Sequence, residues 1–175
     1  MPKFPAYPKI IVNNSSGLGT FLNATAAASA TFPSANRAYY LPFIVNSPVT
    51  ITDISVYIGA TNGSPGPSNI DVGIYDFSGT KLVSSGAQDT TAWTINTLRT
   101  VGITDTVLGR GRFYAAIAAD NTTLALFRNS FGGSSAPISG QLMQATAYPL
   151  PATATFAAST AYSPVMTLHT GGATI

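Results

Sequence analysis

The 175-residue chain contains no cysteine and no glutamate, and it has one histidine and one tryptophan. The lack of cysteine excludes disulfides and thiolate metal sites, and a single histidine leaves too few ligands for a structural zinc site. Small secreted domains often depend on disulfides, so this composition argues against ordinary secretion. No apolar run approaches the ~20 residues of a membrane span, and no signal peptide is evident. We therefore expect a protein made in the cytoplasm, without membrane insertion.

Charge is also scarce, at 8% of residues against about 25% in a typical soluble domain. Eight Lys and Arg oppose six Asp, giving a net charge of +2, and these residues are spread along the chain. This distribution lacks the basic patch of a nucleic-acid-binding protein, so no nucleic-acid partner is expected. A surface with few charges is prone to associate. We expect a homo-oligomer, or a subunit that packs against other proteins.

What the chain does contain is 45% hydrophobic residues, enough for the core of one domain. Apolar residues alternate over short segments that are separated by Gly, Pro, Asn and Asp, and no segment shows a helical period. The spacing predicts about nine or ten short strands in an all-β fold, an antiparallel, jelly-roll-like β-sandwich. The strand segments are 38–45, 49–59, 70–77, 81–85, 91–101, 112–120, 122–129, 141–150 and 161–169.

Several local features refine this prediction. Pro42 lies inside a strand pattern and therefore indicates a sheet edge or a bulge. The alternation slips by one residue around Thr52-Asp53, as it does at a β-bulge. Residues 70–85 read as a hairpin, and residues 112–129 as a second hairpin that turns around Asp120-Asn121.

The N-terminal segment alternates prolines with aromatic residues, a pattern that prevents a helix and favours extended backbone. We predict an extended arm over residues 1–20 and a single β-sandwich domain over residues 21–175. Such an arm would lie on its own domain, a sister subunit or another protein. The candidate assembly anchor consists of Phe4, Pro5, Tyr7 and Pro8.

The stretch VGIYDFSGTKLVSSG (72–86) has apolar side chains on both faces of its first strand. Val72 and Ile74 form one row and Tyr75 and Phe77 the other, whereas a half-buried strand has one polar face. We expect a neighbouring strand layer or a sister subunit to cover the aromatic row, so Tyr75 and Phe77 are the candidate subunit-packing face. Trp93 follows a polar turn and is the candidate exposed contact.

No motif for catalysis or cofactor binding is complete. A glycosidase needs a pair of carboxylates, and nothing singles out two of the six Asp. A Ser-His-Asp triad would require His169, and the closest approach to a G-x-S-x-G elbow is Gly132–Ala136. No EF-hand or phosphate-binding fingerprint occurs. We expect a protein that is not an enzyme and has no cofactor and no metal.

Four segments in order, YYLPFIV, VTITDISVYIG, VGIYDFSGTKLVSSG and GRFYAAIA, resemble a β-sandwich module of tailed-bacteriophage virion proteins. The resemblance spans residues 39–118 and includes Gly111, Phe113 and Ala115, with Tyr114 one place off the usual register. Modules of this kind occur in head-decoration, minor-tail and tail-fibre proteins. The resemblance implies a non-enzymatic module, often trimeric, on the outside of a particle.

Three functions stay open at this point. The first is a virion structural protein, a capsid decoration (cement) protein or a short head or tail fibre, whose partners are other virion proteins. The second is a lectin-like module for host attachment that binds a host-surface glycan through loops 61–69 and 130–140. The third, which the residues favour least, is a carbohydrate-active enzyme with an Asp pair.

Overall fold

A computed structural model describes residues 19–20, 28–59, 68–129, 140–159 and 162–170, and every regular element within these ranges is a strand. The short pairings of two or three residues explain why there are more strands than the predicted nine or ten. In chain order the strands are β1 (Gly19–Thr20), β2 (Ala28–Thr31), β3 (Arg37–Val45), β4 (Val49–Tyr57), β5 (Asn69–Asp76), β6 (Lys81–Ser84), β7 (Gln88–Asp89), β8 (Leu98–Leu108), β9 (Gly111–Ala119), β10 (Ala125–Asn129), β11 (Leu142–Gln144), β12 (Ala157–Ala158), β13 (Ser163–Pro164) and β14 (Met166–Thr170).

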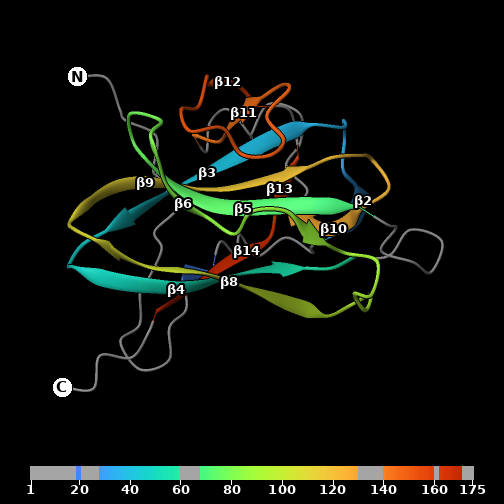
Figure 1. The fold of residues 1–175 in the computed structure, drawn as a ribbon, viewed down its shortest axis with the longest axis horizontal. Coiled ribbons are helices and arrows are strands. Elements are labelled where there is room, and N and C mark those ends of the chain that lie inside the picture. The colour runs from blue at the N-terminus through green and yellow to red at the C-terminus, as the bar shows by residue number, and fades with distance from the viewer. Residues whose placement is uncertain (1–18, 21–27, 60–67, 130–139, 160–161, 171–175) are drawn as a thin grey trace.

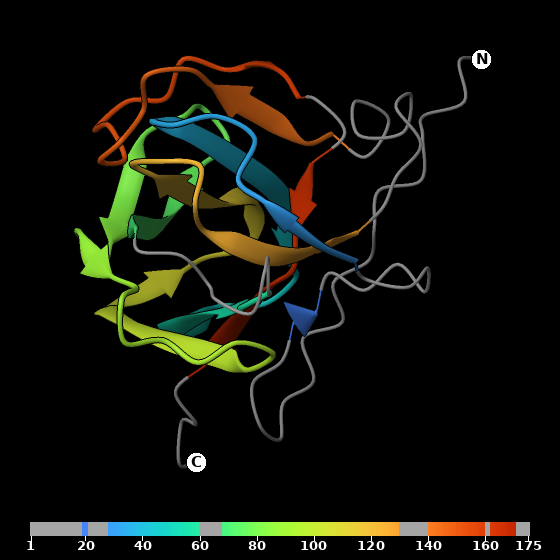
Figure 2. The ribbon, with the colours of Figure 1, turned by 90° about the vertical axis from the view of Figure 1, so that its right-hand side faces the viewer.

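Two antiparallel sheets stack face to face, which confirms the predicted β-sandwich (Figure 1). The seven-stranded sheet has the order β12-β11-β3-β9-β5-β6, with β7 also paired to β5. The four-stranded sheet has the order β1-β14-β4-β8. A three-stranded sheet, β13-β10-β2, lies across one end of the sandwich (Figure 2). The finer expectation of a jelly-roll strand order stays a prediction.

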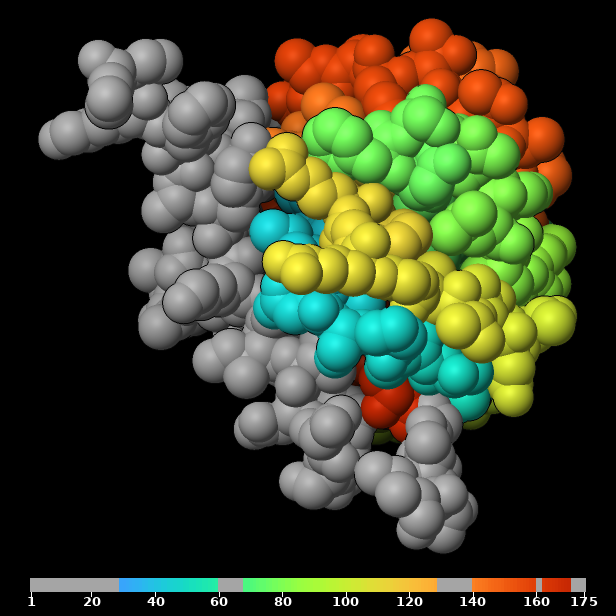
Figure 3. Space-filling model, turned by 90° about the vertical axis from the view of Figure 1, so that its left-hand side faces the viewer, coloured from blue at the N-terminus to red at the C-terminus, as the bar shows by residue number. Residues whose placement is uncertain are grey.

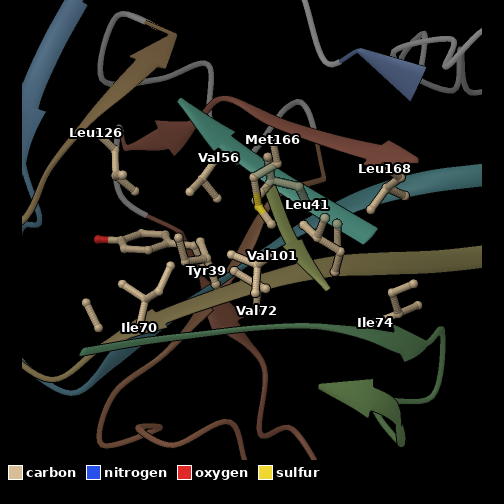
Figure 4. Close-up of a cluster of buried hydrophobic side chains, with 14 of the residues drawn as sticks. Tyr39, Leu41, Val56, Ile70, Val72, Ile74, Val101, Leu126, Met166 and Leu168 are labelled. Atoms are coloured by element: carbon tan, nitrogen blue, oxygen red, sulfur yellow. The ribbon is translucent and has the colours of Figure 1, made fainter. Parts of the chain in front are cut away.

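Period-two alternation explains how the sheets bury a common core. In β5, Ile70, Val72 and Ile74 point to one face, and all three are fully buried. They meet side chains of the opposite sheet such as Val56 and Met166, as Figure 4 shows. Each such side chain contributes about 1.5–3 kcal/mol on burial, so this cluster dominates the stability of the sandwich.

The opposite face of the seven-stranded sheet carries a second apolar cluster. Its members on the sheet are Ala38, Tyr40, Tyr75, Tyr114, Ala116 and Ala118, all of them buried. Residues 141–159, which we call the covering segment, lie over this face and include β11 and β12 (Figure 1). The fold therefore has a third, mostly irregular layer that the strand pattern did not indicate.

The local predictions have different outcomes. The bulge near Thr52-Asp53 is confirmed, because the register of β4 against β8 shifts between Ile51 and Asp53. Pro42 lies beyond the described end of the β3–β11 pairing and keeps regular register with β9, so the edge is confirmed and the bulge is not. Residues 70–85 form the β5–β6 hairpin.

The second predicted hairpin, over residues 112–129, is wrong. β9 pairs with β3 and β5, whereas β10 pairs with β2 and β13. Asp120 does not close a tight turn between paired strands; its carboxylate accepts hydrogen bonds from Asn69 and Ser68 instead. The chain thus crosses from one sheet to another at this point.

Most of the predicted arm lies outside the described residues, and so do Phe4, Pro5, Tyr7 and Pro8. The described part of residues 1–20 is β1, which pairs with β14. Loop 61–69 and loop 130–140 also fall almost wholly outside the described ranges. Their predicted roles in anchoring and in glycan binding stay predictions.

Candidate functional site

The aromatic row of β5 divides between two environments. Tyr75 is fully buried, and its ring packs edge-on against Tyr40 at 5.2 Å between ring centroids. Its hydroxyl donates a 2.5 Å hydrogen bond to the carbonyl of Pro151 in the covering segment. Of the two covers predicted for the aromatic row, a neighbouring strand layer or a sister subunit, the sister subunit is wrong at Tyr75, because a layer of the same chain that includes β11 and β12 already covers it.

The covering segment is fastened to the sheet by polar contacts around Leu150. The Leu150 N–H donates to Oδ2 of Asp71 at 3.0 Å, and Nζ of Lys81 donates to the Leu150 carbonyl at 2.7 Å. The Lys81 N–H also donates to the carbonyl of Ala152 at 2.9 Å. These contacts bind an irregular stretch of backbone to a strand and its hairpin partner, so the segment is a structural layer of the sandwich.

Asp71 is a buried carboxyl on an otherwise apolar strand, with 1% of its surface exposed. Burial raises the pKa of Asp71, and the Leu150 N–H, the charge of Lys81 and the Ser85 hydroxyl counteract part of that rise. A buried carboxyl with a raised pKa can mark an active site. Here its oxygens are used in contacts that hold the covering segment, which favours a structural role.

Phe77, the second residue of the predicted packing face, is 52% exposed. Its ring stacks parallel to that of Tyr114 at 5.7 Å, and the guanidinium of Arg112 lies 5.6 Å from its centroid. This aromatic–cation group lies where the β5–β6 hairpin approaches the start of β9, at the end of the sandwich seen in Figure 3. Phe77 thus remains a candidate contact residue, with an exposed apolar area and a charged rim.

Trp93 is not the exposed contact that its polar neighbours suggested. It is only 8% exposed and belongs to the main core. The connection between β6 and β8 passes from one sheet to the other, and this places the indole at the core. Arg99 lies over the indole, 5.4 Å from its centroid. The prediction for Trp93 is wrong because its position between the sheets outweighs the polarity of adjacent residues.

Two other aspartates, Asp76 and Asp89, hold turns, and Asp120 binds a distant segment. Oδ1 of Asp76 accepts from Ser78 Oγ and the Thr80 N–H, and Oδ1 of Asp89 accepts from Thr91. These hydrogen bonds lower the pKa of Asp76 and Asp89. Burial acts to raise the pKa of Asp120, but the hydrogen bonds from Asn69 and Ser68 outweigh it and leave that pKa lowered. Asp76 and Asp89 thus serve the turn chemistry expected of Asp, whereas Asp120 joins the end of β9 to the start of β5.

A Ser–His contact lies on the outer face of the four-stranded sheet. Ser55 Oγ lies 2.7 Å from Nε2 of His169 and 2.8 Å from Oγ1 of Thr100, and Asp53 is the cross-strand neighbour of His169. A nucleophilic serine must be accessible to substrate, but Ser55 is fully buried. Oδ2 of Asp53 accepts from Thr52. The arrangement is a polar ladder across three strands rather than a working triad.

The described part of the chain contains no group of three or more His, Cys, Asp or Glu side chains that could hold a metal ion. Over the same ranges no helix is long and apolar enough to cross a membrane.

Sequence reasoning missed two features of this region. One is Asp71, and its signal was available: a carboxyl in the middle of the apolar strand IDVGIY is expensive to bury without partners. The other is the group formed by Phe77, Arg112 and Tyr114. Arg112 and Tyr114 lie on β9, whereas Phe77 follows the end of β5, so no local motif could reveal the group.

Comparison with known proteins finds no protein family whose profile matches this chain, and no curated protein with significant similarity to it.

Proposed function

We propose that this chain is a non-enzymatic structural protein of a bacteriophage virion, a small accessory subunit displayed on the particle surface. In this role it is a capsid decoration protein or a short head or tail fibre. It is made in the host cytoplasm, is anchored by its N-terminal arm and oligomerises through the sandwich. The sequence resemblance over residues 39–118 is the observation that carries the proposal.

The use of the acidic side chains supports this role. Asp71, Asp76, Asp89 and Asp120 all accept hydrogen bonds that fix a turn, the covering segment or, for Asp120, the start of β5. A glycosidase needs two carboxyl groups that face each other across a cleft with separated pKa values. Groups that are used to hold the backbone are poorly suited to that task, whereas a particle subunit benefits from a rigid scaffold.

The surface composition supports the same role. Few charges separate neighbouring copies, and the exposed large apolar residues include Phe77, Leu98 and Val107. Such a surface suits a protein that works at high local density in contact with others. The resemblance implies a trimer, and the partners would be capsid or tail proteins.

The test is to find the protein on a particle. Antibodies against the purified chain should label phage particles from the same source, and mass spectrometry should detect it in gradient-purified particles at a constant copy number. A chain lacking residues 1–9 should fold normally but fail to join particles. Absence of the protein from purified particles would refute the virion role.

The alternative function is a lectin-like adhesion module. The half-exposed ring of Phe77 beside Arg112 favours it, because sugars stack on exposed aromatic rings. A glycan array probed with a multivalent form of the protein separates the two. Binding that is lost in Phe77→Ala supports adhesion, and a negative array at high avidity argues against it.

A further inference from the structure

A hydrogen bond joins the two ends of the covering segment. Gln141 is the first residue of this segment, and Tyr162 lies shortly after its end and directly before β13. The side-chain amide nitrogen of Gln141 donates to the backbone carbonyl of Tyr162. This contact closes the base of the covering segment, between the residue where the segment begins and the residue where the chain enters β13.

Three aromatic rings pack together at this base. The ring of Tyr162 lies 5.1 Å from that of Tyr39 and 5.6 Å from that of Phe32, measured between centroids, and Phe32 lies 5.5 Å from Tyr39. Tyr39 is on β3 and Phe32 directly follows β2, so the group joins the seven-stranded sheet to the three-stranded sheet. All three residues are buried. The two tyrosine hydroxyls are therefore enclosed inside the protein.

The polar atoms at the base of the covering segment lack partners within the described protein. Among the described residues, three uncharged side-chain atoms are buried and have no hydrogen-bond partner: the hydroxyls of Tyr39 and Tyr162 and Oε1 of Gln141. All three belong to residues that contact one another here. A buried polar group without a partner loses its hydration and gains nothing in return, so native proteins provide a protein group or a bound water. Three such atoms in one place indicate a bound molecule.

The chemistry of these atoms defines what the site can offer. The Tyr162 carbonyl only accepts hydrogen bonds, so the amide nitrogen of Gln141 faces it and Oε1 is left for another donor. Burial raises the pKa of the Tyr162 hydroxyl above its ordinary value, so this group keeps its proton and can donate. In Figure 4 the hydroxyl of Tyr39 points away from Val72 and Val101. The site thus offers two hydroxyls that donate or accept and one oxygen that only accepts.

These properties favour water over other small molecules. A simple anion only accepts hydrogen bonds, and so leaves Oε1 of Gln141 without a donor. A cation is opposed by the guanidinium of Arg128, which lies 6.0 Å from the centroid of the Tyr162 ring. The direct contacts between the three rings leave no room among them for an organic ligand. Water is small and uncharged, and it both donates and accepts.

We propose that the base of the covering segment binds internal water, held by the hydroxyls of Tyr39 and Tyr162 and by Oε1 of Gln141. The water is part of the fold, because it connects β3 with both ends of the covering segment. It acts together with the Gln141–Tyr162 hydrogen bond to hold the segment over the aromatic face of the seven-stranded sheet. The inference is independent of the virion role, since it concerns how the third layer is fastened.

A high-resolution crystal structure of the full chain tests whether water is bound. We expect ordered water within about 3.2 Å of the two hydroxyls and of Oε1 of Gln141. In a crystal structure of Tyr39→Phe the water should be displaced or less ordered, because it loses one of its partners. A protein group or a different molecule at these three atoms, or the absence of ordered density beside them, would overturn the proposal.

Unfolding in urea tests whether the water stabilises the protein. Tyr39→Phe and Tyr162→Phe each remove one hydroxyl and keep the ring, and each should raise the equilibrium constant of unfolding about fivefold. A dry, unpaired hydroxyl predicts the opposite, because its removal relieves the cost of a buried polar group. Tyr57→Phe is the matched control, since its hydroxyl makes an exposed hydrogen bond of 3.4 Å, and it should change the constant by less than about twofold.

The two experiments have to agree. Ordered water in the crystal structure together with a loss of stability in both variants supports the proposal. Ordered water without any loss of stability would show that the water is not part of the fold, and so would overturn it. A loss of stability without ordered water would show that another group pairs with the hydroxyls, which also overturns it.

Discussion

The hydroxyl of Tyr75 donates a hydrogen bond to the carbonyl of Pro151, 76 residues further along the chain. This contact joins the seven-stranded sheet to the covering segment, which lies over part of the aromatic row of β5. The row is covered at Tyr75 by the chain itself and is left half-exposed at Phe77.

Removing the Tyr75 hydroxyl tests how much this contact stabilises the fold. Tyr75→Phe leaves the ring in place and should lower the free energy of unfolding by about 1 kcal/mol. Tyr75→Ala should lower it by about 3–5 kcal/mol, because it also opens a cavity. Urea unfolding measures both. The control is Tyr57→Phe, whose lost hydrogen bond is exposed and 3.4 Å long, and which should change stability by less than about 0.5 kcal/mol. Equal effects of the two Tyr→Phe changes would contradict the assignment.

The buried carboxyl of Asp71 should make stability depend on pH. Its pKa in the folded state is raised above 3.8, so the folded state binds the proton more tightly than the unfolded state. This contribution favours the folded protein in acid and is lost as the pH rises from near 3.8 through the raised value. Aspartates with lowered pKa act in the opposite direction, so wild type alone cannot isolate the effect.

Asp71→Asn isolates it, because the amide oxygen can still accept from the Leu150 N–H but carries no charge. We expect the stability of Asp71→Asn relative to wild type to increase between about pH 4 and about pH 7. Urea unfolding across this range checks the trend. A difference that does not vary with pH would show that Asp71 has the same pKa in both states.

Gly73 allows β5, β6 and the covering segment to approach closely. A Cβ at this position would lie 2.5 Å from the Val83 carbonyl oxygen and 3.1 Å from Leu150 Cδ1. Gly73→Ala should therefore destabilise the protein by about 1–3 kcal/mol, measured by thermal or urea unfolding. Gly109→Ala has open space around the new methyl group and should be nearly neutral. A neutral Gly73→Ala would mean that the hairpin moves aside without cost.

Trp93 is the only tryptophan, so its fluorescence reports on its burial directly. We expect native emission at a shorter wavelength than in the unfolded protein, and quenching by acrylamide several-fold weaker. Arg99→Ala should increase the quenching, because Arg99 covers the indole. Emission typical of a hydrated indole in the native protein would restore the earlier interpretation of Trp93 as a surface contact.

The parts of the fold that depend on residues close together in the sequence were predictable. The alternation of Ile70, Val72 and Ile74 indicates a strand and its core face, because side-chain direction in a strand follows position alone. The bulge near Thr52 is visible as a slip in the same alternation. The turn at Ser78-Gly79 also follows from local chemistry, since Asp76 binds the residues just after it.

Features that join distant parts of the chain were not predictable in the same way. Trp93 was misplaced because its burial depends on where β6 and β8 end in two different sheets. The predicted hairpin around Asp120 is wrong. Two strands that follow each other in the sequence can pair or can enter different sheets, and the alternation of apolar residues is the same in both cases. The approach of Arg112 to Phe77 also depends on the pairing of β9 with β5.

The sequence by itself determined an all-β chain with few charges, alternating strands and no complete catalytic motif, because composition and period-two patterning act locally. The tertiary structure alone decided what covers the second face of β5. Burial of Tyr75 required a segment 76 residues away, and the fold places that segment there through Asp71, Lys81 and Leu150. Which segment covers Tyr75 depends on the relative free energies of alternative folds of the whole chain, and no single stretch of residues determines these.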